Sequence, residues 1–476
     1  MELKNQFVFR GVGQGLFYTG KVGEFIFVYD CGSMSVKDLS YLNDSIEEFK
    51  EEVNSDTLGL LVISHFDNDH VNGIPNLSKK FKKINTVVMP YIDPLSRLLV
   101  LLNNPRQSTE YYQFLVDPIT YLTSHFSIKE LIIMGEENEE GIRSNDLDNV
   151  YPNDWVVPSG KLVKHFGSED ENFKGRLIET ENLVISDMGS NIYSHGNTGF
   201  LRLDTMWKFS FFNYDLNDES ISLFKQKLAE KGIYCSSKND LKSIVRDNSI
   251  MNNVKKCYNQ FIKEVNTKFG KNIKDLNNTS LVLLHGPMNE ENSDICYFHE
   301  PKRKLTKVIN SRGFKKIIDD SNSVRTKKRR ILNLKKRIDT IKITINYGKT
   351  RSFGIVNRER FLSYKYNFNK TILFGDLNVT KDLDQIQKHF GLELASVTTV
   401  LIPHHASKGY FNQEFIKLFS NWRRSVWVAN YGVTNTYGHP NPELLEQLKD
   451  FEPMIKVALN NELMQIRQHI DVTWKM

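Results

Sequence analysis

The sequence predicts an α/β protein whose short buried strands end in side chains that can bind metal. Apolar runs of three or four residues recur along the chain, at 60–63, 281–284 and 400–402. Such runs, bounded by polar or turn-forming residues, are typical of buried strands. Side chains that can bind metal directly follow several strands, and open sheet folds place their chemistry at the carboxyl ends of strands. We therefore expect one site assembled from strand ends that lie far apart in the sequence.

The other segments extend this α/β pattern along the chain. The expected elements are strands at 6–10, 16–20, 25–29, 341–347 and 371–374, and helices at 38–53, 218–231 and 239–269. They indicate a single elaborated domain over residues 1–476. Its expected parts are a core at 1–90, 271–290 and 341–476, a mixed and helical insertion at 91–270, and a basic insertion at 287–365.

The densest group of metal-binding side chains directly follows the strand at 60–63. The group consists of His65, Asp67, Asp69 and His70, all within six positions. Alternate residues of an extended segment point to one side, so His70 faces away from the other three and the loop can serve two ions. A polar surface turn is the alternative, because Asp and Asn favour turns. Two imidazoles and two carboxylates at this spacing favour metal binding.

Other strand ends carry further candidate ligands, namely Asp30, Asp376, His404 and His405. Taken singly, an Asp after a strand is typical of a turn. A lone His405 is more typical of a hydrogen-bonded polar side chain than of a metal ligand. The same arrangement recurs at separate strand ends, and this recurrence favours one shared site.

Composition and charge place the chain among globular proteins of the cytoplasm. Its 476 residues, 40% of them hydrophobic, can bury a substantial core. The longest apolar stretch, 95–102, is far too short to cross a bilayer, and the first residues lack the pattern of a secretory signal. We therefore expect a cytoplasmic protein without a membrane partner. The scattered Cys31, Cys235, Cys257 and Cys296 indicate reduced thiols.

The net charge of +6 is unevenly distributed, with Lys and Arg concentrated between 302 and 337. Such a segment attracts polyanions. A solvated helix or loop kept soluble by its lysines is the alternative, and it is the usual reading of a charge run taken alone. The segment points to nucleic acid only when a phosphate-cleaving site lies elsewhere in the chain.

Together these motifs resemble those of the metallo-β-lactamase-fold hydrolases. Within that superfamily the chain is most similar to the hydrolase domain of the competence DNA-uptake channel protein and its soluble relatives. The resemblance lies in residues 12–15, 30–32, 65–73, 278–283, 375–376, 403–407 and 437–440. These motifs follow the order of the family. The resemblance implies a four-layer αββα sandwich with metal along one edge between the sheets.

Two departures from the family pattern bear on the metal. Asp67 stands where the wider superfamily has its second His, a replacement that the competence-type group shares. The His expected just before Ser280 is missing, with His285 and His195 as alternative substitutes. One metal position is therefore richer in oxygen ligands, which favour harder ions, so Mn or Mg competes with Zn.

The resemblance also implies a ligand set for two divalent ions. His65 and Asp67 would bind one ion, and Asp69 and His70 the other. Asp376 would bridge the two ions, and either His404 or His405 would complete the second position. Asp30 would orient a ligand imidazole from behind. Asp69 would also accept a proton from the attacking water.

Several residues near these motifs are candidates for substrate contact. They are Ser280, Ser407, Lys408 and His439. Ser407 either caps a helix that begins near Gly409 or binds the substrate. His439 either donates a proton to the leaving oxygen or caps the helix that follows Pro440.

These observations predict a metal-dependent phosphodiesterase, foremost a nuclease that cleaves DNA or RNA by attack of a metal-bound hydroxide. The basic segment at 302–337 would contact the nucleic acid. One alternative is a hydrolase of a small phosphodiester, a lactone or a thioester. Another is a component of a bacterial defence assembly whose insertions bind protein partners.

Overall fold

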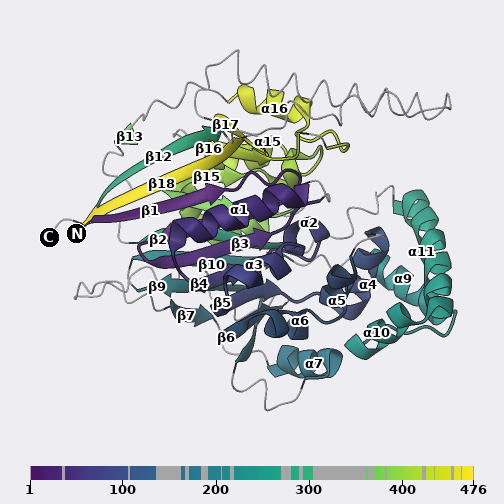
Figure 1. The fold of residues 1–476 in the computed structure, drawn as a ribbon. Helices are drawn as coiled ribbons and strands as arrows, with labels where there is room; N and C mark the ends of the chain where they lie inside the picture. Colours follow the sequence, from purple (N-terminus) through teal and green to yellow (C-terminus); the bar gives the residue numbers. More distant parts are fainter. Residues whose placement is uncertain are drawn as a thin grey trace, which may run out of the picture.

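Two large β-sheets with helices packed against them form the protein in the computed structural model (Figure 1). The structure describes residues 2–34, 38–104, 108–135, 162–166, 171–183, 191–204, 206–214, 219–269, 280–288, 293–303, 361–362, 369–380, 383–420, 425–433, 435–451, 455–462 and 464–474. Of the helices in these ranges, none has both the length and the apolar character needed to span a membrane.

The first sheet has the strand order β13-β12-β18-β1-β2-β3-β4-β5-β6-β8. Its strands are β1 (Glu2–Phe9), β2 (Phe17–Val22), β3 (Phe25–Cys31), β4 (Thr57–Val62), β5 (Lys83–Pro90), β6 (Ser127–Met134), β8 (Ile192–His195), β12 (Ser293–Arg303), β13 (Phe361–Leu362) and β18 (Met464–Trp474). Strands β3, β4, β5, β6 and β8 pair in parallel, and the other pairs are antiparallel. The carboxyl ends of β3 and β4 therefore meet at one edge.

The second sheet has the strand order β17-β16-β15-β14-β11-β10-β9-β7. Its strands are β7 (Leu162–Phe166), β9 (Thr198–Leu203), β10 (Trp207–Tyr214), β11 (Ser280–Pro287), β14 (Lys370–Leu373), β15 (Val397–Leu401), β16 (Ser425–Asn430) and β17 (Ile455–Asn460). Strands β14 to β17 are parallel. Their carboxyl ends supply the second half of the site described below.

The helices lie along the outer faces of the sheets and in a group at one end of the molecule (Figure 1). They are α1 (Asp38–Val53), α2 (Asn68–Val71), α3 (Ile74–Lys80), α4 (Pro94–Asn103), α5 (Thr109–Val116), α6 (Pro118–His125), α7 (Glu171–Glu181), α9 (Glu219–Ala229), α10 (Lys238–Arg246), α11 (Asn248–Phe269), α14 (Leu383–Phe390), α15 (Gln413–Ser420) and α16 (Pro442–Lys449). Local sequence fixes several helix starts. Asp93, for example, accepts hydrogen bonds from the amides of Leu95 and Ser96 and so caps α4.

Three apolar clusters hold the layers together, because successive side chains of a strand point to opposite faces. On β3, Phe27 lies in the cluster between the two sheets, whereas Val28 faces the helices of the first sheet. A third cluster joins the outer face of the second sheet to α14, α15 and α16 through residues such as Phe415 and Leu445. This arrangement is compatible with the α/β sandwich of the metallo-β-lactamase fold.

A few hydrogen bonds cross the apolar space between the sheets. The hydroxyl of Tyr29 donates to the carbonyl of Leu281 at 3.0 Å and lies 3.4 Å from the carbonyl of Leu373. Nε2 of His285 on β11 lies 2.9 Å from the hydroxyl of Tyr18 on β2, and within the second sheet Nδ1 of His285 accepts from Trp207 at 3.4 Å. Since buried polar groups need partners, the contacts of Tyr29 and Tyr18 fix how one sheet sits on the other.

The segment 91–270, expected as an insertion, contributes strands to both sheets. Strands β6 and β8 extend the first sheet, and β7, β9 and β10 extend the second. The expected helical character is present in α9, α10 and α11. Most of the expected basic insertion, residues 304–360, lies outside the described residues, and so does the strand expected at 341–347.

Candidate metal centre

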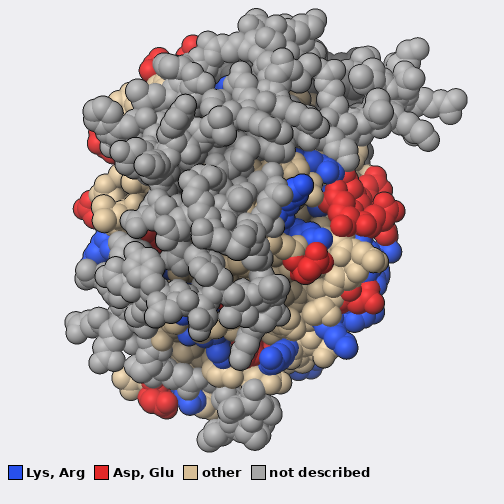
Figure 2. All heavy atoms as spheres, turned by 90° about the vertical axis from the view of Figure 1, so that its left-hand side faces the viewer, with Lys and Arg blue, Asp and Glu red and all other residues tan. Residues whose placement is uncertain are grey.

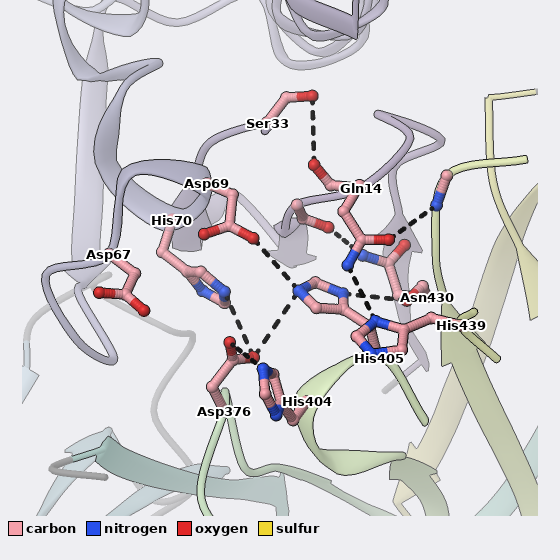
Figure 3. A network of polar contacts seen from close by, with 12 residues as sticks. Gln14, Ser33, Asp67, Asp69, His70, Asp376, His404, His405, Asn430 and His439 are labelled. Carbon is pink, nitrogen blue, oxygen red and sulfur yellow. Dashed lines mark hydrogen bonds and ion pairs between the residues drawn. The ribbon is translucent and has the colours of Figure 1, made fainter. Parts of the chain in front are cut away.

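The ends of strands from both sheets bring the candidate ligands together, and Figure 3 shows Asp67, Asp69, His70, Asp376, His404 and His405. In the first sheet, Asp30 lies near the end of β3, and His65 and Asp67 lie in the loop after β4. That loop runs directly into the short helix α2, whose residues include Asp69 and His70. In the second sheet, Asp376 follows β14, and His404 and His405 lie in the 3₁₀ turn η5 (Pro403–Ala406) after β15.

The Asp376 carboxylate lies between two pairs of imidazoles. Its Oδ2 atom is 3.7 Å from Nε2 of His65 and 3.5 Å from Nε2 of His404. Its Oδ1 atom is 3.4 Å from Nε2 of His70 and 3.7 Å from Nε2 of His405. Each oxygen therefore faces its own pair of ring nitrogens, as a carboxylate shared by two metal positions would.

Side-chain geometry defines three groups able to hold an ion. They are His65, Asp67 and Asp376; Asp69, His70 and His405; and Asp30, His65 and His70. In the third group both carboxylate oxygens of Asp30 already accept hydrogen bonds, from Ser64 and from His70. The first two groups are therefore the better metal positions.

Hydrogen bonds behind the rings set the tautomers of three histidines. Nδ1 of His70 lies 2.8 Å from Oδ2 of Asp30, and Nδ1 of His405 lies 3.0 Å from the carbonyl of Asn430. Both partners only accept, so both rings carry their proton on Nδ1. The Ser64 hydroxyl donates to Asp30 at 2.5 Å and accepts from Nδ1 of His65 at 2.8 Å. In the neutral form of each ring, the lone pair of Nε2 therefore points toward the centre.

The residues present fit divalent metal ions. The Nε2 atoms of His65, His70 and His405 are buried and have no hydrogen-bond partner among the described residues. Burying a polar nitrogen without a partner is unfavourable. An ion held by these nitrogens and the neighbouring carboxylates would satisfy all three. The donor set of imidazoles and carboxylates suits Zn, Mn or Mg.

Burial and mutual charge shift the pKa values of the cluster. Burial and the neighbouring His70 lower the pKa of His65 to about 3. Burial also acts to lower the pKa of His70, but the carboxylates of Asp376 and Asp30 outweigh it and hold that pKa well above its usual value. Burial acts to raise the pKa of Asp376, and the surrounding histidines outweigh it. The Asp376 carboxyl is therefore ionised at neutral pH.

The adjacent histidines of η5 face different parts of the centre. Nε2 of His405 is 3.4 Å from Oδ2 of Asp69, whereas His404 faces the Asp376 oxygen that His65 also approaches. Three successive non-glycine residues with positive φ, 45° at His404, 55° at His405 and 60° at Ala406, produce this divergence. Such strain persists only where surrounding structure enforces it, and it concentrates at functional sites. The geometry thus places His405 in the group with Asp69 and His70.

The two alternative substitutes for the missing histidine lie away from the centre. His285 is enclosed between the sheets by Tyr18 and Trp207. His195, at the end of β8, stacks on Phe166 with ring centroids 4.8 Å apart. His404, by contrast, lies on the same side of Asp376 as His65. It is therefore better placed than His285 or His195 to replace the histidine that was expected just before Ser280.

For two serines the structure argues against a role considered from the sequence, namely substrate contact for Ser280 and helix capping for Ser407. The Ser280 hydroxyl donates to the carbonyl of Phe374 at 3.1 Å and is buried, so it supports the turn before Asp376 rather than contacting substrate. Ser407 does not cap a helix near Gly409. Helix α15 begins at Gln413, and Asn412 accepts from the amide of Phe415 within its first turn.

A cavity of about 460 Å³ opens onto the centre. Its lining includes the expected residues Asp67, Asp69, Asp376, His404, His405, Ser407, Lys408 and His439. His439 does not cap the next helix, because Asn441 accepts from the amide of Leu444 and caps α16. Lys408 reaches the cavity rim, where its ammonium lies 2.6 Å from Glu443. The volume is in the range of small-ligand pockets.

The cavity also contains residues that sequence reasoning did not single out. They are Gln14, Met34, Asn103, Asn104, Tyr410 and Tyr437. Gln14 belongs to the glycine-rich turn at 11–15. Such a turn could have indicated a residue near the site, because glycines let the backbone approach a site closely. Asn103 and Asn104 come from the end of α4, far from any motif.

Comparison with known proteins adds little to this geometry. No family model and no curated protein matches the chain. Among solved structures it is similar to the metallo-beta-lactamase fold protein YhfI from Bacillus subtilis, at 12% identity and a TM-score of 0.16. The match covers 45% of this chain and 55% of that one, about half of each. The His and Asp groups themselves suggest divalent metal binding.

Proposed function

We propose that the protein is a metal-dependent phosphodiesterase with a four-layer αββα fold, related to the competence-type hydrolases, and that it cleaves DNA or RNA. The placement of Asp376 supports this proposal most strongly. Its two oxygens face separate pairs of imidazoles, at 3.4 to 3.7 Å. A carboxylate in this position can hold two ions side by side, and such a pair suits displacement at phosphorus.

The chain's own residues would divide the work around the phosphate. When bound, the ions would activate a water and offset the charge that develops on the attacked phosphate. Burial acts to raise the pKa of Asp69, but the neighbouring His405 and the charge of His70 outweigh it and lower that pKa, so the carboxylate is ionised. Asp69 lines the cavity and can accept the proton of the attacking water. Asp67 and Asp69 add oxygen ligands, which favours Mn or Mg beside Zn.

The basic segment at 302–337 supports a polyanionic substrate. On the face drawn in Figure 2, the described Lys and Arg side chains lie among Asp and Glu side chains. Among the described residues visible on that face, basic side chains therefore do not form a continuous positive patch. We accordingly assign nucleic-acid binding to the segment at 302–337.

A substrate panel tests the proposal. The purified chain is incubated with single-stranded DNA, double-stranded DNA and RNA in Mn, Mg or Zn, beside the Asp376→Asn variant. The exposed Asp384 offers a matched control, Asp384→Asn, which changes the same chemical group at a residue outside the cavity lining. Wild type and control should cleave a polynucleotide, and Asp376→Asn should not. If metal binds yet no polynucleotide is cut, the nuclease proposal is wrong.

Hydrolysis of a small phosphodiester is the second candidate, and the cavity volume of about 460 Å³ favours it. A pocket of this size suits a ligand of drug-like dimensions. Replacing the Lys and Arg residues of 302–337 with Gln separates the two proposals. Cleavage of nucleic acid should collapse if that segment binds the polyanion. Turnover of bis(p-nitrophenyl) phosphate should be unchanged in either case, and a lactone or thioester in the same assay tests the remaining ester classes.

A further inference from the structure

Gln14 contacts His439 at the wall of the metal cavity (Figure 3). The Nε2 atom of Gln14 lies 3.2 Å from Nδ1 of His439. Gln14 is 3% exposed, and the two residues are 425 positions apart in the chain. A buried amide that meets a ring nitrogen at the active cavity fixes which ring atom carries the proton.

A second hydrogen bond fixes the orientation of the Gln14 amide. The backbone N–H of Gly432 donates to Oε1 of Gln14 at 3.3 Å, so the amide nitrogen is the end that faces His439. A Cβ atom at position 432 would lie 2.7 Å from the backbone nitrogen of Gln14, so the close approach requires glycine. The amide donates, Nδ1 of His439 accepts, and the proton of the neutral ring is on Nε2.

The neighbouring His405 ring has the opposite tautomer. His405 donates from Nδ1 to the carbonyl of Asn430, which leaves the lone pair on Nε2 for a metal. The two rings lie nearly parallel, with centroids 6.1 Å apart and an interplanar angle of 18°. A carbonyl behind one ring and an amide N–H behind the other thus give adjacent imidazoles opposite roles.

The His439 backbone is held as firmly as its ring. Its N–H donates to Oδ1 of Asn435 at 3.1 Å, and its carbonyl accepts from Nδ2 of Asn435 at 2.6 Å. With both the backbone and Nδ1 engaged, Nε2–H is the polar group that His439 offers to the cavity. A preorganised donor of this kind stabilises negative charge that develops on an oxygen.

We propose that Gln14 is a positioning residue that keeps His439 in the Nε2–H tautomer, so that His439 donates a hydrogen bond to a phosphate oxygen. In this role His439 neither binds metal nor transfers its proton. The inference rests on the proposed phosphodiesterase function and adds a specificity element to it. A site with a fixed neutral donor selects substrates that present an acceptor oxygen at that point.

Nitrogen NMR of the full-length protein labelled with ¹⁵N-histidine tests the tautomer without any turnover. His439 is assigned by its absence in His439→Gln. The wild-type ring should show protonated Nε2 and unprotonated Nδ1, in metal-free and Mg-loaded protein. In Gln14→Glu at pH 9, the carboxylate accepts instead, and the proton should move to Nδ1. A wild-type ring protonated on Nδ1 would overturn the inference.

Turnover of bis(p-nitrophenyl) phosphate tests the donor role. His439→Leu should lower kcat about 100-fold, the usual cost of losing one such donor. His439→Gln places an amide N–H near the Nε2 position and should stay within about tenfold of wild type. At pH 9, Gln14→Glu keeps a hydrogen bond to His439 yet should lose kcat as His439→Leu does, with its metal content unchanged.

Two kinetic results would overturn the donor role. One is equal loss in His439→Gln and His439→Leu, which would require a group that transfers protons. The other is full activity in Gln14→Glu after the proton has moved to Nδ1. If wild type turns over no phosphodiester, the proposed function fails by itself, and the NMR result still decides the tautomer.

Discussion

A single carboxylate, that of Asp30, is hydrogen-bonded to His70 at 2.8 Å and reaches His65 through the Ser64 hydroxyl. Asp30 is fully buried and has a φ of 55°. Its left-handed backbone places the side chain behind both imidazoles rather than beside them. One residue thereby sets the tautomers of two candidate metal ligands.

Asp30→Asn should weaken metal binding about 10- to 100-fold, the usual effect of losing a partner behind a ligand histidine. The Asn amide has one acceptor oxygen in place of two, so its NH₂ group must face either the Ser64 N–H or the pair formed by the Ser64 hydroxyl and Nδ1 of His70, all of which donate to Asp30. The two rings then lose their fixed orientation. Calorimetric titration with Mn or Zn measures the change. Asp56→Asn is the matched control, because its side chain is 79% exposed and far from the ligands. Equal affinities in wild type and Asp30→Asn would contradict the assigned role.

Metal binding should release at least one proton near neutral pH, because burial is outweighed by the neighbouring carboxylates, which raise the pKa values of both His70 and His405. The raised pKa of His70 keeps its ring protonated in the metal-free protein, and this proton must leave before Nε2 can bind an ion. His65, with its pKa lowered to about 3, contributes no proton. Affinity should therefore fall as pH falls, by up to about tenfold per pH unit for each proton released. Calorimetry in buffers of different ionisation enthalpy counts the protons, and a count of zero at pH 7 would refute the prediction.

Gly375→Ala should destabilise the fold and displace Asp376. Gly375 has a φ of +55°, and a Cβ there would lie 2.5 Å from Oγ of Ser280 and 2.8 Å from Oγ of Ser64. We expect a loss of about 2–4 kcal/mol in the free energy of unfolding, from backbone strain and overpacking together. Gly409→Ala is the control, because Gly409 has a φ of +85° with nothing within 4 Å of the added Cβ.

The control should lose only about 1–2 kcal/mol, the cost of the backbone conformation alone. Denaturant unfolding in the presence of a chelator compares the two variants without any metal contribution. Equal losses would show that the space beside Gly375 is not what restricts this position.

A chelator should lower the melting temperature of the wild type. An ion at 100 times its dissociation constant stabilises the folded chain by about 2.7 kcal/mol, because it binds the folded form alone. Asp376→Asn should remove this metal-dependent gain, since all four imidazoles surround that carboxylate. Asp384→Asn should keep it. Thermal unfolding with and without Mn measures the gain, and a gain retained in Asp376→Asn would exclude Asp376 as a shared ligand.

The metal centre is largely predictable from the sequence because its ligands follow strands that a simple pattern reveals. The apolar residues before Asp376 lie in or next to β14 (Lys370–Leu373), and the run 400–402 before His404 includes the last two residues of β15 (Val397–Leu401). Since parallel strands bring their carboxyl ends to one edge, Asp376 after β14 and His404 after β15 are expected to lie close together. The side that each histidine faces is not predictable in this way. It depends on the left-handed turn at 404–406, a conformation that side-chain type does not specify.

Two other features cannot be predicted from the sequence, for different reasons. They are the strands that 91–270 adds to the sheets and the contact of Gln14 with His439. Strand β6 alternates exposed and intermediate residues over its first half, so its apolar run is short and resembles part of a helix. Gln14 is visible as part of a turn, but its contact with His439 follows from how distant loops meet. The substrate role expected of Ser280 fails for a related reason, since its hydroxyl is directed by the pairing of β11 with β14.

The Tyr29 hydroxyl ties the two halves of the metal centre into one mechanical unit. Tyr29 directly precedes Asp30 in the first sheet. Its hydroxyl contacts the carbonyls of Leu281 on β11 and Leu373 on β14 in the second sheet, and Leu373 lies three residues before Asp376. Any sliding of one sheet over the other would have to break these bonds within the dry interior. The spacing between the ligands of the two sheets is thus set by a residue that contacts neither ion nor substrate. A substitution of Tyr29 would therefore change the metal preference of the centre without altering any ligand.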